Sequence, residues 1–203
     1  MLHLPDDAPL TWVFTGDSIT QAVYHTHGAR GWVEHVQERV RGQLGRLTDV
    51  VVNTGMSGWT AADVLGRADH LVTRFRPDVL SVSLGTNDCI EGPAGLPAFR
   101  DAMRGLVASA APGTQVVLHT PVVVGHSGRG RRAAQPAYCE AVRELAVEQG
   151  ALLVDHEAHW RRHFGEEDPI AWIDDAAHPN ALGHLEMARL TLRTLELGGL
   201  DPL

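Results

Sequence analysis

Five short apolar runs alternate along this chain with longer amphipathic stretches, and this alternation constrains the fold more than any other feature. Each apolar run has the length of a single strand, and each amphipathic stretch repeats its apolar residues at helical spacing. We predict strands over residues 11–17, 49–55, 77–88, 114–124 and 151–155. We predict helices over residues 32–44, 60–75, 96–110 and 133–150, and a last helix in the segment that begins at His178.

Strands that are almost continuously apolar and are separated by helices are typical of a parallel sheet covered by helices on both faces. The sequence therefore predicts an α/β fold. The 203 residues contain no internal repeat, no low-complexity tract and no segment that reads as a linker. We expect a single domain over residues 1–203, because a chain of this length can bury one substantial core.

Polar segments that contain glycine follow each of the first three predicted strands. They are GDS at 16–18, NTGMSG at 53–58 and GTND at 85–88. Gly, Asp, Asn and Ser are common in turns, so one such segment alone indicates only a turn. In open α/β sheets, however, ligands bind beyond the carboxyl ends of the strands. Three polar strand ends at the same edge therefore indicate a functional site.

Ser18 in the first of these segments, together with an aspartate and a histidine nearer the C-terminus, has the chemistry of a catalytic triad. Asp175 and His178 lie three residues apart at the predicted entry to the last helix. A serine hydroxyl is a weak nucleophile until a base removes its proton, and His178 can be that base for Ser18. Asp175 can fix the tautomer of the imidazole and stabilise the imidazolium. We preferred Asp175 to its neighbour Asp174 for this role because of the spacing, and we expect Asp174 to be solvated.

Attack on an acyl carbonyl creates an oxyanion, which requires hydrogen-bond donors that are already in place. The N–H of Ser18 is one candidate donor. The backbone N–H of Gly55 is a second, because a residue without Cβ permits a close approach. The side-chain amide of Asn87 is a third. Every role in acyl transfer therefore has a candidate residue.

These blocks resemble those of the SGNH (GDSL-type) hydrolases. The match runs through GDSIT at 16–20, NTGMSG at 53–58, GTND at 85–88 and DAAHP at 175–179, in this order and over nearly the whole chain. The resemblance implies a three-layer α/β/α sandwich, flavodoxin-like, with a five-stranded parallel sheet of order 2-1-3-4-5. It also implies Ser18 as nucleophile, Asp175 and His178 as its triad partners, and Ser18, Gly55 and Asn87 as the oxyanion hole.

We therefore predict a serine esterase that hydrolyses small acyl esters or thioesters through an acyl-enzyme intermediate. An acyltransferase is an alternative, because the same triad serves both reactions. A flavodoxin-like binding module is a second alternative, but the chain lacks the glycine-rich loop that holds phosphates. We expect no cofactor. The G-x-S-x-G elbow of other hydrolases is also absent from the sequence.

Charge and cysteine content narrow the expected partners and location. The formal net charge of −8 disfavours binding to nucleic acid or to an anionic membrane. The two cysteines, Cys89 and Cys139, form no metal-binding or disulfide pattern. The N-terminal residues do not resemble a signal peptide. We therefore expect a cytoplasmic enzyme whose partner is a small-molecule ester. The arginines at 129, 131 and 132 form the only compact basic run in the sequence. We interpret them as a solvated loop, and the alternative is a loop beside the active site that contacts an anionic substrate.

Twelve histidines raise the question of a metal site. The segment His156–His159 resembles the H-E-x-x-H motif of zinc proteases but is one residue short of it, so we expect no metal. His25 and His27 follow Ser18 closely along the chain. We interpret them as ordinary loop residues, with the rim of the pocket as the alternative.

Overall fold

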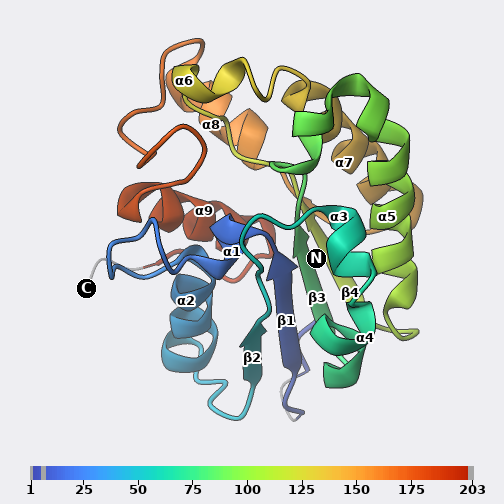
Figure 1. The fold of residues 1–203 in the computed structure, drawn as a ribbon. Helices are drawn as coiled ribbons and strands as arrows, with labels where there is room; N and C mark the ends of the chain where they lie inside the picture. Colours follow the sequence, from blue (N-terminus) through green and yellow to red (C-terminus); the bar gives the residue numbers. More distant parts are fainter. Residues whose placement is uncertain (1, 6–7, 201–203) are drawn as a thin grey trace.

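The computed structural model describes residues 2–5 and 8–200 of the chain. Its centre is a sheet of five parallel strands in the order β2-β1-β3-β4-β5. The strands are β1 (Thr11–Gly16), β2 (Val50–Asn53), β3 (Val79–Ser83), β4 (Gln115–His119) and β5 (Leu152–Val154). Helices pack on both faces of this sheet, so the predicted α/β/α sandwich and its strand order are confirmed (Figure 1).

One face of the sheet packs against α2 (Trp32–Gln37), α8 (His156–Phe164) and α9 (Ala181–Thr194). The alternation of side chains along β1 sends Trp12 and Phe14 into this layer. Phe14 meets the edge of Trp32 on α2 with 5.4 Å between ring centroids. In Figure 1, α2 and α9 lie side by side to the left of the sheet.

The other face of the sheet packs against α3 (Ala61–Leu65), α4 (Ala68–Leu71), α5 (Leu96–Ser109) and α7 (Gln135–Gln149). Val13 of β1 points into this second layer, between the two aromatic residues that point the other way. These helices lie to the right of the sheet in Figure 1. Because both faces are covered, the strands are apolar along their length, as the sequence indicates.

Several predicted helices are divided or extended in the structure. The predicted helix at 60–75 consists of α3, α4 and a 3₁₀ turn at Thr73–Phe75, because the chain leaves helical geometry at Arg67. The helix that begins with α2 continues as a π-helix over Glu38–Gln43. The structure adds α1 (Ser18–Gln21), α6 (His126–Arg129), α8 and a 3₁₀ segment at Asp88–Gly95, which the sequence analysis did not predict. None of the described helices has the length and apolar character needed to cross a membrane.

All five strands end before their predicted ends, and β3 and β4 do so by the widest margin. β3 ends at Ser83 rather than near residue 88, and Gly85 turns the chain with a φ of 120°. β4 ends at His119 rather than near residue 124, because Pro121 has no N–H to donate to a neighbouring strand. Both strands therefore release the chain at the carboxyl edge of the sheet, where the polar segments lie.

Candidate active site

Ser18 is the first residue of the short helix α1, which begins directly after β1. The preceding Asp17 is buried, and its Oδ1 accepts the N–H of Ile19 at 2.9 Å, so this side chain caps the helix. This sharp passage from strand to helix brings the Ser18 hydroxyl to the carboxyl edge of the sheet.

The structure brings Ser18, His178 and Asp175 together. Ser18 Oγ lies 2.8 Å from His178 Nε2. His178 Nδ1 lies 2.9 and 3.0 Å from the two carboxylate oxygens of Asp175. The three side chains form one hydrogen-bonded line, although 160 residues of sequence separate the serine from the histidine.

Electrostatics favour a neutral imidazole beside an ionised carboxylate. Burial lowers the pKa of His178, and this effect outweighs the nearby Asp175 carboxylate, which raises the pKa. Burial alone would raise the pKa of Asp175, but the backbone N–H groups of Ala177 and His178, with the imidazole, lower it to about 2. A neutral ring can accept a proton from Ser18, and the carboxylate can hold the resulting imidazolium.

A tight hairpin before α9 carries the aspartate and the histidine. Ile173 and Pro179 form an isolated antiparallel bridge, and the N–H of Asp174 donates to the carbonyl of His178 at 2.8 Å. Asn180, not Pro179, is the N-cap of α9, with its Oδ1 accepting two backbone N–H groups. Pro179 therefore lies just outside the helix, before its N-cap.

The three predicted oxyanion donors lie on three different strand ends. The N–H of Ser18 belongs to the first turn of α1, where N–H groups have no acceptor within the helix. The N–H of Gly55 donates to Asn53 Oδ1 at 2.9 Å. The Asn87 amide donates to the carbonyl of Trp59 at 3.0 Å, and a carboxamide carries a second hydrogen.

Gly55 also has a packing role that the sequence analysis did not identify. A Cβ at this position would overlap the backbone of Thr20 and Gln21 in α1. In addition, Asn53 Nδ2 donates to the carbonyl of Thr20 at 2.7 Å. The segment after β2 is therefore packed tightly against the helix that carries Ser18.

Two buried carboxyl groups lie behind the serine. Burial raises the pKa of Asp17 to about 7. The hydrogen bond from the Ile19 N–H lowers this pKa, and the charge of the neighbouring Asp88 raises it. Burial likewise raises the pKa of Asp88. Asp88 Oδ1 accepts the N–H of Ala61 at 2.8 Å, so Asp88 holds the start of α3 rather than only its own turn.

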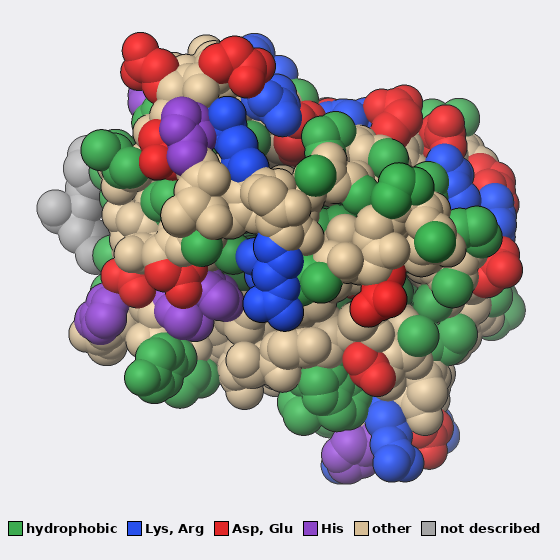
Figure 2. Space-filling model, turned by 45° about the horizontal axis from the view of Figure 1, so that its top comes forward, with side chains coloured by type: hydrophobic (Ala, Val, Ile, Leu, Met, Phe, Trp, Pro, Cys, Tyr) green, Lys and Arg blue, Asp and Glu red, His purple; other side chains and the backbone are tan. Residues whose placement is uncertain are grey.

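The sequence analysis did not predict that His25 contacts His178. Its ring stacks on that of His178, with 3.4 Å between centroids and 11° between planes. Asp174 is exposed, as we expect for a solvated neighbour, and its Oδ1 also lies 2.8 Å from Nε2 of the exposed His27. The signal in the sequence was the pair of histidines that follows Ser18 so closely. On this face of the molecule, Figure 2 shows histidine side chains gathered beside acidic ones.

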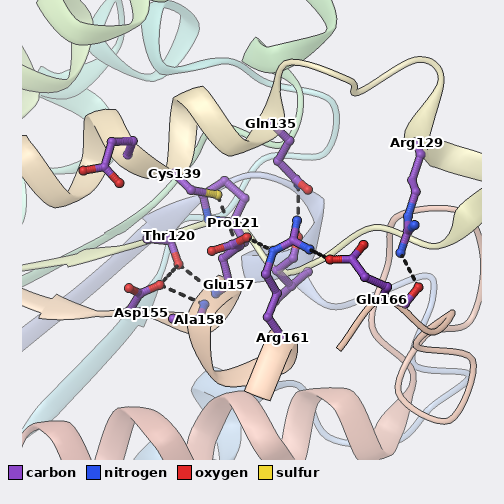
Figure 3. Close-up of polar contacts among 12 residues, drawn as sticks. Thr120, Pro121, Arg129, Gln135, Cys139, Asp155, Glu157, Ala158, Arg161 and Glu166 are labelled. Atoms are coloured by element: carbon purple, nitrogen blue, oxygen red, sulfur yellow. Dashed lines mark hydrogen bonds and ion pairs between the residues drawn. The ribbon is translucent and has the colours of Figure 1, made fainter. Parts of the chain in front are cut away.

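The basic run at 129–132 is not uniformly solvated. Arg131 is exposed, whereas Arg132 is half-buried and its Nε donates to the carbonyl of Thr86 at 3.0 Å. Arg129 Nη2 donates to the carbonyl of Glu166 at 3.3 Å, and Arg161 pairs with the carboxylate of Glu166 (Figure 3). Arg129, Arg132 and Arg161 line part of a cavity of about 290 Å³. Arg132 thus connects this cavity to the GTND segment.

The residues at the site fit a proton-transfer set better than a metal site. His25, Asp175 and His178 bring potential ligand atoms within 4.8 Å of one another. Stacked parallel rings, however, cannot both direct their in-plane lone pairs at one ion. In the near-match to a zinc motif, His156 is buried against His119, while Glu157 pairs with Arg143 and Arg161, so these side chains serve packing and ion pairs.

The five-stranded parallel sheet of order 2-1-3-4-5, with a serine, a histidine and an aspartate joined at its carboxyl edge, matches the SGNH class of hydrolases. The family model of the GDSL-like lipase/acylhydrolase family matches residues 14–185. The chain belongs to this family and is an ester-hydrolysing serine esterase.

Relatives agree with this assignment. An acetylxylan esterase from Geobacillus stearothermophilus is 29% identical over 202 residues, which cover 90% of this chain and 92% of the relative. The structure of Axe2, an acetylxylan esterase from the same organism, has a TM-score of 0.78 at 27% identity and covers 92% of this chain and 94% of that one. LAE5, a hydrolase from the metagenome of Lake Arreo in Spain, has a TM-score of 0.78 at 26% identity, with 94% and 96% covered.

Proposed function

We propose that Ser18 is the nucleophile of this esterase, with His178 as its general base and Asp175 as the residue that orients the base. The observation that carries the proposal is the continuous line from Ser18 Oγ through His178 Nε2, at 2.8 Å, to the Asp175 carboxylate. Relatives support the proposal, because replacements of a serine, an aspartate and a histidine in Axe2 are known as catalytic mutants. The aspartate and the histidine are three positions apart there too.

The reaction follows from the roles of these residues. Ser18 Oγ attacks the acyl carbon while its proton passes to His178 Nε2. The carbonyl oxygen becomes an oxyanion, which we assign to the N–H groups of Ser18 and Gly55 and to the Asn87 amide. The Gly55 N–H already donates to Asn53 Oδ1. To reach the oxyanion as well, it must form a bifurcated hydrogen bond to both acceptors. His178 then protonates the leaving alcohol, and a water molecule repeats the sequence on the acyl-enzyme to release the acid.

We propose further that the substrates are acetyl esters, including those on sugars. The support is the similarity over nearly the full chain to an acetylxylan esterase. Hydrolysis of acetylated xylo-oligosaccharides and of p-nitrophenyl esters of increasing chain length tests this. We expect kcat/KM to fall as the acyl chain grows beyond acetyl, and a preference for long chains would contradict the proposal.

Acyl transfer to an alcohol uses the same groups and stays an alternative to hydrolysis. The division of product between free acid and an acylated acceptor, measured with increasing acceptor concentration, separates the two. A cytoplasmic location also stays a prediction from sequence, and fractionation of cells that express the full natural gene tests it.

A further inference from the structure

The histidine that stacks on His178 is the most unusual feature of the site. The planes of the His25 and His178 rings are 11° from parallel, and their centroids are 3.4 Å apart, which is the contact distance of two stacked aromatic rings. Both side chains are only 21% exposed. His25 therefore covers one face of the proposed base and shields this face from water.

A defined turn holds His25 in this place. Ala22 and His27 adopt left-handed φ values of 54° and 50°, and Gly28 follows with 86°. Within the turn, the buried Thr26 donates its hydroxyl to the carbonyl of Ala22 at 3.1 Å and accepts the N–H of Ala29 through its own carbonyl at 2.9 Å. The loop after α1 thus curls back over the site.

The hairpin that carries Asp175 and His178 anchors the same loop. His27 Nε2 lies 2.8 Å from Asp174 Oδ1. His25 Nδ1 lies 3.6 Å from Asp175 Oδ2 and 3.8 Å from Asp174 Oδ2, which is too long for a hydrogen bond. The short contact of His25 is therefore the one between the face of its ring and the ring of His178. The nearby carboxylates act on His25 only through their charge.

We propose that His25 is a positioning residue of the reaction: its ring packs on the face of His178 and holds that imidazole in the plane in which Nε2 points at Ser18. This inference rests on the proposed role of His178. The ring face, rather than a proton on His25, carries the effect.

The pH dependence follows from the charges around His178. Asp175 favours the protonated ring, whereas Arg132 and His25 disfavour it, and the buried His184 is a further cation when protonated. The largest influence is burial, which lowers the pKa of His178. Replacement of His25 by alanine admits water to the ring face of His178. Hydration of the ring raises the pKa of His178, so the acidic limb of kcat/KM should move to higher pH.

His25 itself faces the carboxylates of Asp174 and Asp175, the ring of His178 and the edge of Tyr24, whose centroid is 5.3 Å away. Phenylalanine at position 25 preserves a flat ring of similar size over His178 but cannot carry charge. His25→Phe therefore separates the effect of the ring face from that of a proton.

The experiment compares His25→Ala, His25→Phe and, as a control, His70→Ala, which removes an exposed histidine from α4. For His25→Ala we expect kcat to fall about ten-fold with little change in KM, since only part of the 10²–10⁴ contribution of a general base is lost. We expect the acidic limb to rise by about half a unit to one unit. His25→Phe should keep most of kcat, and His70→Ala should match the wild type.

A wild-type kcat and acidic limb in His25→Ala would overturn the inference. An equal loss in His25→Ala and His25→Phe would also overturn it, because the ring face would then not be the acting group. His178→Ala distinguishes the inference from the proposed function on which it rests. If His178→Ala keeps full activity, the proposed function fails; if it is inactive while His25→Ala is unaffected, only the role of His25 fails.

Discussion

Asn87 joins two strand ends at the site, because its amide bonds to the carbonyl of Trp59 and can also reach an oxyanion. We predict that Asn87→Ala lowers kcat by roughly 10²–10³, as loss of one donor to a developing charge does in other hydrolases. Steady-state kinetics on an acetyl ester measure this. Asn87→Asp is the matched variant, since it keeps the size but removes the donor, and should also be slow. A normal kcat in both variants would place the oxyanion elsewhere.

At the residue scale, the sequence allowed the prediction of side chains whose chemistry recurs at fixed places. Ser18 follows a strand, and Asp175 lies three residues from His178; the structure brings all three together. His25 could not be predicted to stack on His178, because the contact depends on left-handed residues in a loop whose path no periodicity reveals. The contact of Asp174 with His27 could not be predicted for the same reason, since His27 belongs to that loop.

At the scale of elements, the tight contact between the segment after β2 and α1 leads to a prediction for Gly55→Ala. The added Cβ would overlap the backbone of Thr20 and Gln21, so α1 must shift and Ser18 with it. We expect a loss of about 1–3 kcal/mol in the free energy of unfolding, as for other overpacked sites, together with a marked fall in kcat. Denaturant unfolding and kinetics measure the two effects.

Gly130→Ala is the control for this substitution, because a Cβ there meets no atom within 4 Å. It should change the free energy of unfolding by no more than about 0.5 kcal/mol. If Gly55→Ala behaves in the same way, the close packing between α1 and the segment after β2 does not constrain the site.

The elements themselves were predictable to different degrees. The strands and α5 were found because their apolar residues recur with a clear period. α8 was missed because few of its side chains are buried, and two of those, His156 and Glu157, are polar. The ends of β3 and β4 were misplaced because apolar residues continue past them in irregular segments such as Val122–Val124.

At the scale of the whole molecule, buried histidines make stability depend on pH. Burial lowers the pKa of His156 to about 3 and that of His184 to about 4, and lowers that of His119 as well. The unfolded chain takes up these protons below about pH 6.5, whereas the folded chain does not. The contribution of these neutral histidines to the free energy of unfolding is therefore present above pH 6.5 and is lost as the pH falls. At pH 5, His156 and His184 each cost on the order of 2 kcal/mol, and His119 acts in the same direction.

Asp17 opposes this trend. Its pKa is raised to about 7 in the folded state, so the folded chain holds a proton there that the unfolded chain has released. Its contribution therefore grows as the pH falls from about 7 to 4. The raised pKa of Asp88 acts in the same direction. The three histidines outweigh the two carboxyl groups, and we expect a net loss of stability in acid.

Thermal unfolding at pH 8, 7, 6 and 5 and constant ionic strength tests this balance. We predict that Tm falls between pH 7 and pH 5 by roughly 4–8 °C, as a net loss of about 2 kcal/mol implies for a chain of this size. Asp17→Asn keeps the capping oxygen but removes the opposing titration, so its Tm should fall more steeply. A Tm that is constant or higher at pH 5 would contradict the account. We also expect one cooperative transition, as for a single domain.

The central claim is that Ser18 is the nucleophile, and covalent labelling with a fluorophosphonate tests it most directly. The wild type and Ser18→Ala are treated alike, and the labelled position is located by mass spectrometry after proteolysis. We predict one adduct on Ser18 in the wild type and none in Ser18→Ala, with the same Tm for both untreated proteins. An adduct on another residue, or labelling that persists in a folded Ser18→Ala variant, would contradict the account.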